Sequence, residues 1–195
     1  FDWEQGDEKN IQDVFSSAAH VTEIELVNNR VVVNSMEPRG LIADWEGDAA
    51  KMTIRMGTQG GWVLRSLLAN AILHVPEEDI RVITPDVGGA FGMKLFFYSE
   101  CAVTVWASRK LGRPIKWIGE RSDAFLSDTQ GRDHVTRAKL AFDADHKITG
   151  MSVETNANLG AYLSTFGPLI PTMAAVKVLP GVYDIPNFYY HSIGV

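Results

Sequence analysis

A glycine-rich stretch is the part of the sequence best suited to bind a ligand. It reads Pro85-Asp86-Val87-Gly88-Gly89-Ala90-Phe91-Gly92-Met93-Lys94 and falls between a predicted strand and a predicted helix. Small residues let neighbouring backbone N–H groups turn toward one point, which suits a phosphate or a metal-bound oxide. Composition alone favours the simpler interpretation of a tight turn. The stretch matches neither the dinucleotide nor the Walker pattern, so nucleotide binding has little support.

Five side chains in or outside this stretch are candidates for chemistry or for its support. The amide of Gln59 can donate a hydrogen bond without carrying a charge, although a lone glutamine is otherwise a surface residue. Glu37 follows an apolar run, and is interpreted as a buried carboxylate with a raised pKa or, preferably, as the ion-pair partner of Arg39 or another arginine. Lys94 is interpreted as a surface charge, and Phe91 as a core residue or a lid over a pocket. The histidines show no paired ligand spacing, so no protein-ligated metal is expected.

The elements that must position these residues mix strands and helices, which predicts an α/β (mixed α+β) fold with a mixed sheet, two main helices and long hairpins. Apolar stripes predict helices over residues 63–72 and about 97–111, the second ending at Gly112 and Pro114. Turn residues at 46–48 and 143–146 predict two hairpins. Strands are predicted over residues 20–26, 30–33, 41–45, 52–56, 80–83, 115–118, 138–142, 151–155 and 188–195. We expect no internal domain boundary within residues 1–195.

Composition narrows the function classes. The 195 residues are 46% hydrophobic and 22% charged, which is typical of a globular protein, and the net charge of −6 matches nucleic acid and anionic lipid poorly. No apolar run approaches the length needed to span a bilayer. Cys101 is the only cysteine, so neither a disulfide nor an iron–sulfur cluster is expected within the chain, and a cytoplasmic location is predicted. The chain begins with Phe1 and not with Met, which predicts a fragment of a longer protein.

Residues 87–94 are similar to the Gly-Gly-Gly-Phe-Gly-x-Lys loop of the molybdenum hydroxylases, the xanthine dehydrogenase, aldehyde oxidase and aerobic carbon monoxide dehydrogenase family. Other family motifs are matched in the same order along most of the chain. They lie at residues 36–39, 57–59, 112–117, 120–122, 131–133 and 160–162. The chain thus resembles the molybdopterin-binding large subunit of this family, and looks most similar to the carbon monoxide dehydrogenase branch.

The resemblance implies roles for individual residues. Gln59 would contact the apical oxygen ligand of molybdenum, and Phe91 with Gly92 would contact the metal centre through the backbone, so Gln59 and Phe91 are the predicted catalytic residues. No side chain would bind molybdenum directly, because the pterin holds the metal. The predicted cofactor-binding residues are Gln59, Gly88, Gly89, Ala90, Phe91 and Gly92. Two positions depart from the family pattern: Ala90 replaces a glycine, which is a mild change if its φ is negative, and Leu95 replaces the glutamate of purine-oxidising members.

The resemblance also implies an activity. The whole enzyme would oxidise a small carbon substrate (carbon monoxide, an aldehyde or an N-heterocycle) with water as the oxygen source. Its cofactor would be a molybdopterin, with the cytosine dinucleotide form as one option. Expected partners are an iron–sulfur subunit, an FAD subunit (or domains of each kind), and the remainder of the large subunit. We expect the fragment alone to be inactive, because the general-base glutamate of the family lies beyond residue 195. The alternative is a binding or assembly module that kept the fold and lost the cofactor chemistry.

Overall fold

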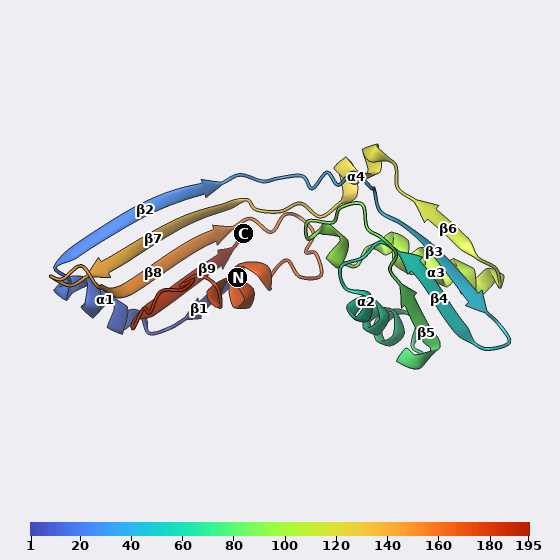
Figure 1. The fold of residues 1–195 in the computed structure, drawn as a ribbon, viewed down its shortest axis with the longest axis horizontal. Helices are drawn as coiled ribbons and strands as arrows, with labels where there is room; N and C mark the ends of the chain where they lie inside the picture. The colour runs from blue at the N-terminus through green and yellow to red at the C-terminus, as the bar shows by residue number, and fades with distance from the viewer. The chain divides into compact units, whose positions relative to one another are not determined.

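The computed structural model describes all 195 residues, which form two compact units. Unit 1 contains Phe1–Val31 and Gly131–Val195, and unit 2 contains Val32–Gln130. The middle of the chain therefore builds one unit, and the two ends of the chain together build the other. Each unit contains its own sheet (Figure 1).

Unit 1 is built on a five-stranded sheet with the order β1-β9-β8-β7-β2. Its strands are β1 (Asp2–Gln5), β2 (His20–Asn28), β7 (His134–Phe142), β8 (Ile148–Ala157) and β9 (Phe188–Gly194). Strands β8 and β9 run parallel, whereas all other neighbours run antiparallel, so the sheet is mixed. The unit also contains helix α1 (Glu8–Ser17) and a π-helix, η4 (Ile170–Ala174).

The turn between β7 and β8 is closed by an aspartate side chain. Oδ1 of Asp143 accepts hydrogen bonds from the N–H groups of Asp145 and Lys147, each at 2.9 Å. Aspartate favours turns because its side chain can bind the backbone a few residues further along. This turn confirms the hairpin predicted from residues 138–155.

Helix α1 was not predicted from the sequence pattern. It begins after Asp7, whose side chain accepts a hydrogen bond from the N–H of Asn10 at 2.9 Å, as helix N-caps do. Its buried residue Ile11 packs where β8 has Gly150, since a Cβ at residue 150 would lie only 3.0 Å from Cδ1 of Ile11. The helix therefore depends on a close contact with a strand that is far away in the sequence.

The second predicted strand of the chain is wrong. Residues 30–33 form only an isolated bridge, between Val31 and Gly131. Strand β2, which was predicted, pairs along its whole length with β7. Local alternation identified β2, but its partner comes from a distant part of the chain.

Unit 2 is built on a four-stranded mixed sheet with the order β5-β4-β3-β6. Its strands are β3 (Gly40–Glu46), β4 (Lys51–Met56), β5 (Ile80–Ile83) and β6 (Ile115–Ile118). The pairing of Trp45 with Met52 confirms the predicted hairpin around residues 46–48. The helices are α2 (Gly61–Leu67), α3 (Ser99–Leu111) and α4 (Arg121–Ser127), with a π-helix η1 (Leu68–Leu73) and the 3-10 turns η2 (Glu77–Asp79) and η3 (Met93–Leu95).

The core of unit 2 lies between the sheet and the helices α2, η1 and α3 (Figure 1). It consists of apolar side chains that alternate along β3 and β4 and recur at helical spacing: Leu41, Ala43, Met52, Ile54, Leu64, Leu68, Ala69, Leu73, Ile80, Cys101 and Val105. The predicted helices over residues 63–72 and 97–111 are therefore confirmed, the first as α2 continued by η1. Helix α3 ends at Gly112, whose φ of 62° is the left-handed value that favours glycine. None of the helices has both the length and the apolar character needed to cross a membrane.

The predicted mixed α/β fold class is confirmed, with two mixed sheets. Among the strands and α-helices, three escaped the sequence patterns: β1, α1 and α4. The glycine-rich stretch lies in unit 2, after β5 and before α3, so the order predicted from the sequence is correct.

Candidate functional site

The glycine-rich loop, residues 84–92, has the backbone conformation that its composition predicts. Gly89 and Gly92 have φ values of 97° and 93°, and Phe91 between them has a φ of 51°. These values are rare for residues with a side chain, so the two glycines are required by the path of the backbone. Ala90 is not among the residues with positive φ, which is the condition under which an alanine is tolerated there.

Gln59 lies in the loop between β4 and α2, and it contacts the glycine-rich loop directly. Its Oε1 accepts a hydrogen bond from the N–H of Gly92 at 2.9 Å. A backbone N–H can only donate, so the contacting atom must be the amide oxygen. The Nε2 group of Gln59 keeps both of its protons for another acceptor, and no acceptor within the chain takes them.

Three consecutive backbone amides of the loop have no partner within the chain. The N–H of Gly92 is bound by Gln59, and the N–H of Gly88 is bound by Oε2 of Glu37 at 2.9 Å. The N–H groups of Gly89, Ala90 and Phe91 make no hydrogen bond in the chain. The prediction placed the backbone amides of residues 88–92 at the site, and those of residues 89–91 are the ones free to bind a ligand.

The surface where the two loops meet is open to solvent. Gln59 is exposed, and the side chain of Phe91 is 78% exposed. The interpretation of Phe91 as a core residue is therefore wrong. Phe91 lies against its own loop, since a Cβ at residue 89 would be 3.0 Å from its ring.

Lys94 is a buried residue, so its interpretation as a surface charge is wrong. Its side chain is 1% exposed, and its Nζ lies 2.6 Å from Oε2 of Glu37. The hydrogen bond from Lys94 holds the pKa of Glu37 below its ordinary value, although burial acts in the opposite direction. Glu37 thus has neither the raised pKa nor the arginine partner that were considered for it; its partner is Lys94.

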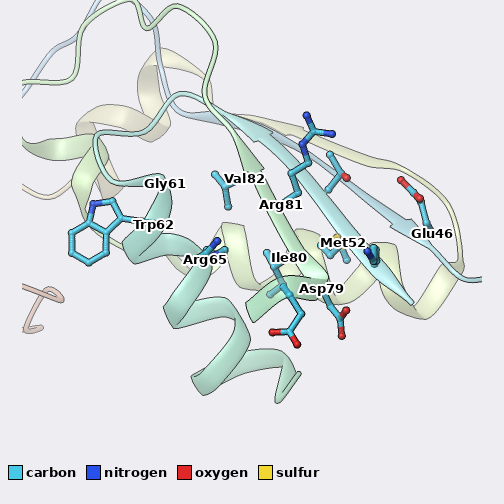
Figure 2. Close-up of a pocket in the computed structure, with 12 residues that line it drawn as sticks. Glu46, Met52, Gly61, Trp62, Arg65, Asp79, Ile80, Arg81 and Val82 are labelled. Atoms are coloured by element: carbon cyan, nitrogen blue, oxygen red, sulfur yellow. The ribbon is translucent and has the colours of Figure 1, made fainter. Parts of the chain in front are cut away.

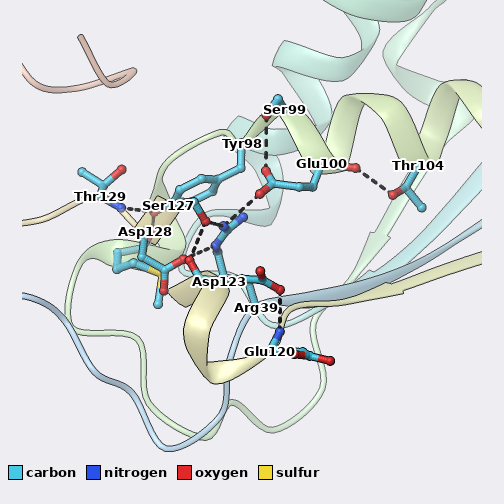
Figure 3. Close-up of polar contacts among 11 residues, drawn as sticks. Arg39, Tyr98, Ser99, Glu100, Thr104, Glu120, Asp123, Ser127, Asp128 and Thr129 are labelled. Atoms are coloured by element: carbon cyan, nitrogen blue, oxygen red, sulfur yellow. Dashed lines mark hydrogen bonds and ion pairs between the residues drawn. The ribbon is translucent and has the colours of Figure 1, made fainter. Parts of the chain in front are cut away.

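Arg39, two residues further on, forms a separate buried network (Figure 3). Its Nε lies 2.5 Å from Oδ1 of Asp128, and its Nη2 lies 3.1 Å from Oε1 of Glu100. Its guanidinium also stacks on the ring of Tyr98 at 3.6 Å. Burial opposes the charge of Arg39, but the hydrogen bonds to Glu100 and Asp128 raise its pKa above the ordinary value. The network joins β3, α3 and the end of α4.

Tyr98 links this network to the glycine-rich loop. Its hydroxyl donates to the carbonyl oxygen of Met93 at 3.0 Å and accepts from the N–H of Thr129 at 3.1 Å. Burial raises the pKa of the phenol, so the hydroxyl keeps its proton as a donor. Sequence reasoning missed Tyr98 because a lone tyrosine carries no signal. It also missed the burial of Lys94, for which the only signal was its place in the motif.

A groove of about 610 Å³ lies elsewhere in unit 2, beside β5 and α2 (Figure 2). It is lined by Glu46, Lys51, Met52, Thr53, Gly61, Trp62, Arg65, Glu78, Asp79, Ile80, Arg81 and Val82. The lining contains both acidic and basic side chains, so its charge does not select one kind of ligand. None of the residues predicted for the site belongs to it.

The meeting point of the two loops has the chemistry needed to bind oxygen atoms that carry negative charge. The available donors are the Gln59 amide and three backbone N–H groups, all neutral, and the carboxylate of Glu37 is already bound to Lys94. A Cβ at Gly92 would meet nothing within 4 Å, so the chain leaves open space next to these donors. Such donors suit an oxide or phosphate, and this donor set therefore fits the oxygen ligands of a molybdenum cofactor.

The fold is a mixed α/β domain, and this donor set is chemically suited to a cofactor that carries oxygen atoms. The chain belongs to the molybdopterin cofactor-binding domain family, whose model matches residues 1–195. This match confirms the family predicted from the glycine-rich loop and its accompanying motifs, and supports a molybdenum cofactor.

Individual relatives support the same assignment. Subunit gamma of the 6-hydroxypseudooxynicotine dehydrogenase complex of Paenarthrobacter nicotinovorans is 34% identical over 180 residues, which make up 92% of this chain and 22% of that protein. The carbon monoxide dehydrogenase large chain of Hydrogenophaga pseudoflava is 29% identical over 195 residues, or 24% of its length. The chain therefore spans about a quarter of the length of these relatives.

Solved structures share the fold. The carbon monoxide dehydrogenase of Oligotropha carboxidovorans superposes with a TM-score of 0.84 at 28% identity, covering 100% of this chain and 24% of that one. Quinoline 2-oxidoreductase of Pseudomonas putida 86 superposes with a TM-score of 0.83 at 29% identity, covering 100% of this chain and 25% of that one. The predicted fold of a molybdenum-cofactor-binding domain is thus confirmed.

Proposed function

We propose that residues 1–195 are part of the molybdopterin-binding domain of a larger oxidoreductase subunit, in which Gln59 and the loop around Phe91 hold an oxygen ligand of molybdenum. The observation that carries the proposal is the hydrogen bond from Gly92 to Oε1 of Gln59. It joins the two loops and leaves the Nε2 protons of Gln59, with the N–H groups of Gly89, Ala90 and Phe91, as free donors.

The cofactor would supply the redox and oxygen-transfer chemistry, and the chain would supply position and electrostatics. Because Gly92 fixes the oxygen of the Gln59 side chain, its amide nitrogen is oriented before the cofactor binds. Oriented neutral donors stabilise negative charge on an oxygen with little rearrangement. Gln59 and the backbone of Phe91 would therefore act on the reacting centre, and Gly88, Gly89, Ala90 and Gly92 would shape the loop around it.

The substrate class that we propose is a small carbon compound: carbon monoxide, an aldehyde or an N-heterocycle, oxidised with water as the oxygen source. The relatives include a carbon monoxide dehydrogenase large chain, a nicotine 6-hydroxylase large subunit and an aldehyde oxidoreductase molybdenum-binding subunit. Leu95 stands where purine-oxidising members have a glutamate, and it packs on the start of α2, since a Cβ at Gly60 would lie 2.8 Å from its Cδ1. An apolar residue there disfavours purines.

We also propose the partners that such a reaction requires. Electrons would leave through iron–sulfur clusters and FAD on other subunits or domains, and the pterin would have the plain or the cytosine dinucleotide form. Several relatives are named as subunits or large chains of complexes, which supports a multi-subunit enzyme. The single cysteine, Cys101, is free and buried, and this is the basis for proposing a cytoplasmic location.

A substitution of Gln59 tests the proposal in the full-length subunit assembled with its partners. Gln59→Glu keeps an oxygen for the Gly92 N–H, but replaces the donor by an acceptor of negative charge. We expect kcat to fall by about a hundredfold to a thousandfold, the loss seen when an oriented donor is removed. Molybdenum content is measured alongside, to separate loss of the cofactor from loss of turnover.

Gln12→Ala is the control, because Gln12 is exposed on α1 and its side chain bonds only to Glu8. A Gln59→Glu subunit with the parent's kcat and molybdenum content would contradict the proposal. The alternative function, an assembly module without cofactor chemistry, predicts that the parent subunit holds no molybdenum at all. Metal analysis of the parent therefore separates the two functions.

A further inference from the structure

Residue 94 makes contacts with both segments that meet at the site. Its carbonyl oxygen accepts from the hydroxyl of Thr58 at 3.0 Å and from the N–H of Gln59 at 3.3 Å. Its ammonium lies 2.6 Å from Oε2 of Glu37, and the same oxygen accepts from the N–H of Gly88 at 2.9 Å. The backbone of Lys94 thus holds the loop between β4 and α2 that carries Gln59 (the glutamine loop). Its side chain holds Gly88, the first glycine of the glycine-rich loop, through Glu37.

These contacts fix the position of the glutamine loop relative to the glycine-rich loop, on which the site depends. The bond between Gln59 and Gly92 forms only if the glutamine loop and the glycine-rich loop stay in register. Lys94 lies two residues after Gly92 and is tied to both loops, so a shift of either loop must break one of its contacts. One backbone hydrogen bond, from the N–H of Glu37 to the carbonyl oxygen of Gly88 at 3.0 Å, also places Glu37.

The two partners of the ion pair are buried to different degrees. The Lys94 side chain is 1% exposed and that of Glu37 is 46% exposed. A buried ammonium without a partner is unfavourable, so Lys94 strongly favours the position of Glu37 observed here. Removing Lys94 instead leaves a carboxylate that water can reach, so this change loosens the loop without leaving a buried charge.

We infer that Lys94 is a positioning residue that sets the direction of the Gln59 amide by joining the Glu37 segment, the glutamine loop and the glycine-rich loop. The inference rests on the proposed function, because the proposed oxygen ligand is the target of that amide. Groups that orient a ligand-binding residue typically change metal affinity or activity by about tenfold to a hundredfold when they are removed.

The test uses the full-length subunit that carries this chain, and measures three quantities in the parent and in Lys94→Met. They are the hydrogen exchange of the Gly88 and Gly92 amides, the molybdenum content, and kcat with KM. We expect exchange of both amides to rise at least about tenfold, while exchange in β3 stays unchanged, and kcat or molybdenum content to fall by about tenfold to a hundredfold with little change in KM. Lys94→Arg, which keeps a cation, should restore part of the protection. Lys110→Met is the matched control, since Lys110 is exposed on α3 and makes no ion pair.

Two results would overturn the inference: parent-like exchange at Gly88 and Gly92 in Lys94→Met, or an equal acceleration throughout unit 2, which would mean a general loss of stability. If Lys94→Met does not accumulate as folded protein, Thr58→Val decides. It removes the Thr58 hydroxyl, which donates to the Lys94 carbonyl and accepts from the N–H of Gly60 at 3.2 Å. Both bonds lie on the Gln59 side, so Gly92 should exchange about threefold to tenfold faster while Gly88, held by Glu37, should not change. The inference would also be overturned if Thr58→Val changed the exchange of Gly88 and Gly92 by the same factor relative to the parent.

The failure of this inference can be told apart from the failure of the proposed function. A parent subunit without molybdenum ends the proposed function, and the exchange data still decide whether Lys94 joins the loops. If the parent contains molybdenum and Lys94→Met shows parent-like exchange, the inference is refuted and the proposed function stands.

Discussion

Replacing Arg39 by leucine should destabilise unit 2 more than any exposed substitution. The Arg39 side chain is 8% exposed, and its partner Asp128 is 2% exposed. Oδ2 of Asp128 has no hydrogen-bond partner, so Arg39 is the main compensation for this carboxylate. Leucine fills much of the same space, but leaves Asp128 as a buried charge without its cation.

The magnitude follows from this burial. Removing one partner of a buried ion pair typically costs about 3–5 kcal/mol. Each 1.4 kcal/mol is about a factor of ten in an equilibrium constant. Opening of unit 2 should therefore become roughly a hundredfold to several thousandfold more frequent in Arg39→Leu.

The difference in the stability of unit 2 between the parent and Arg39→Leu should also depend on pH. Burial, the largest single influence, acts to raise the pKa of Glu100. The hydrogen bond from Arg39, a backbone hydrogen bond, the charge of Arg39 and the hydrogen bond from Ser99 together outweigh it, and the folded pKa lies below the ordinary value of 4.5. A lowered folded pKa stabilises the native state above the unfolded pKa, and this contribution is lost as the pH falls through the folded pKa. Arg39→Leu lacks the part of this contribution that comes from Arg39 at every pH. The difference in the free energy of unfolding between the parent and Arg39→Leu should thus be largest at pH 7 and decrease below about pH 4.5.

Hydrogen exchange of the β3 amides measures this opening, because β3 lies in the core of unit 2. The ratio of variant to parent is taken at pH 7 and at pH 4, so the intrinsic pH dependence of exchange cancels. Arg55→Leu is the control: Arg55 is exposed on β4 and makes no ion pair, and it should change stability by at most about 0.5 kcal/mol. A ratio for Arg39→Leu no larger than that of the control, or a ratio that grows at pH 4, would refute the reasoning.

Two further outcomes are expected from the loop and the core. Gly92→Ala should lower the stability of the loop by about 1–3 kcal/mol through backbone strain at φ 93°, whereas Gly88→Ala should do so by collision with Cβ of Glu37, 2.6 Å away; hydrogen exchange of the loop amides checks both, and parent-like exchange in either variant would contradict this. The thiol of Cys101 should not react with disulfide reagents at pH 8 unless the unit unfolds, because it is buried and burial raises its pKa to about 12; rapid labelling of the native subunit in a thiol assay would contradict this.

Much of unit 2 could be predicted because its elements are specified by neighbouring residues. Alternating apolar side chains and the turn at residues 46–48 were enough for the β3–β4 hairpin, and Gly112 was enough for the end of α3. The glycine pattern between a strand and a helix also predicted a loop whose small residues let backbone N–H groups turn outward, and the positive φ values of Gly89 and Gly92 agree with it. In each case the signal and the structure lie within a few residues of each other.

Contacts between distant segments could not be predicted in the same way. The sequence does not show that β2 pairs with β7, or that α1 packs on Gly150, because pairing depends on which segments meet in space. The interpretation of Glu37 failed for the same reason: the chain offers 18 Lys and Arg side chains, and only packing selects Lys94 among them.

The sequence by itself determined the family, the fold class and the two loops that should form a site, because these depend on residue types at short spacing. Only the tertiary structure decided which amides of the glycine-rich loop remain free, and that a buried lysine connects the loops. The physical reason is that a donor becomes available or satisfied through the group placed opposite to it. That group is brought there by the packing of segments that are remote along the chain.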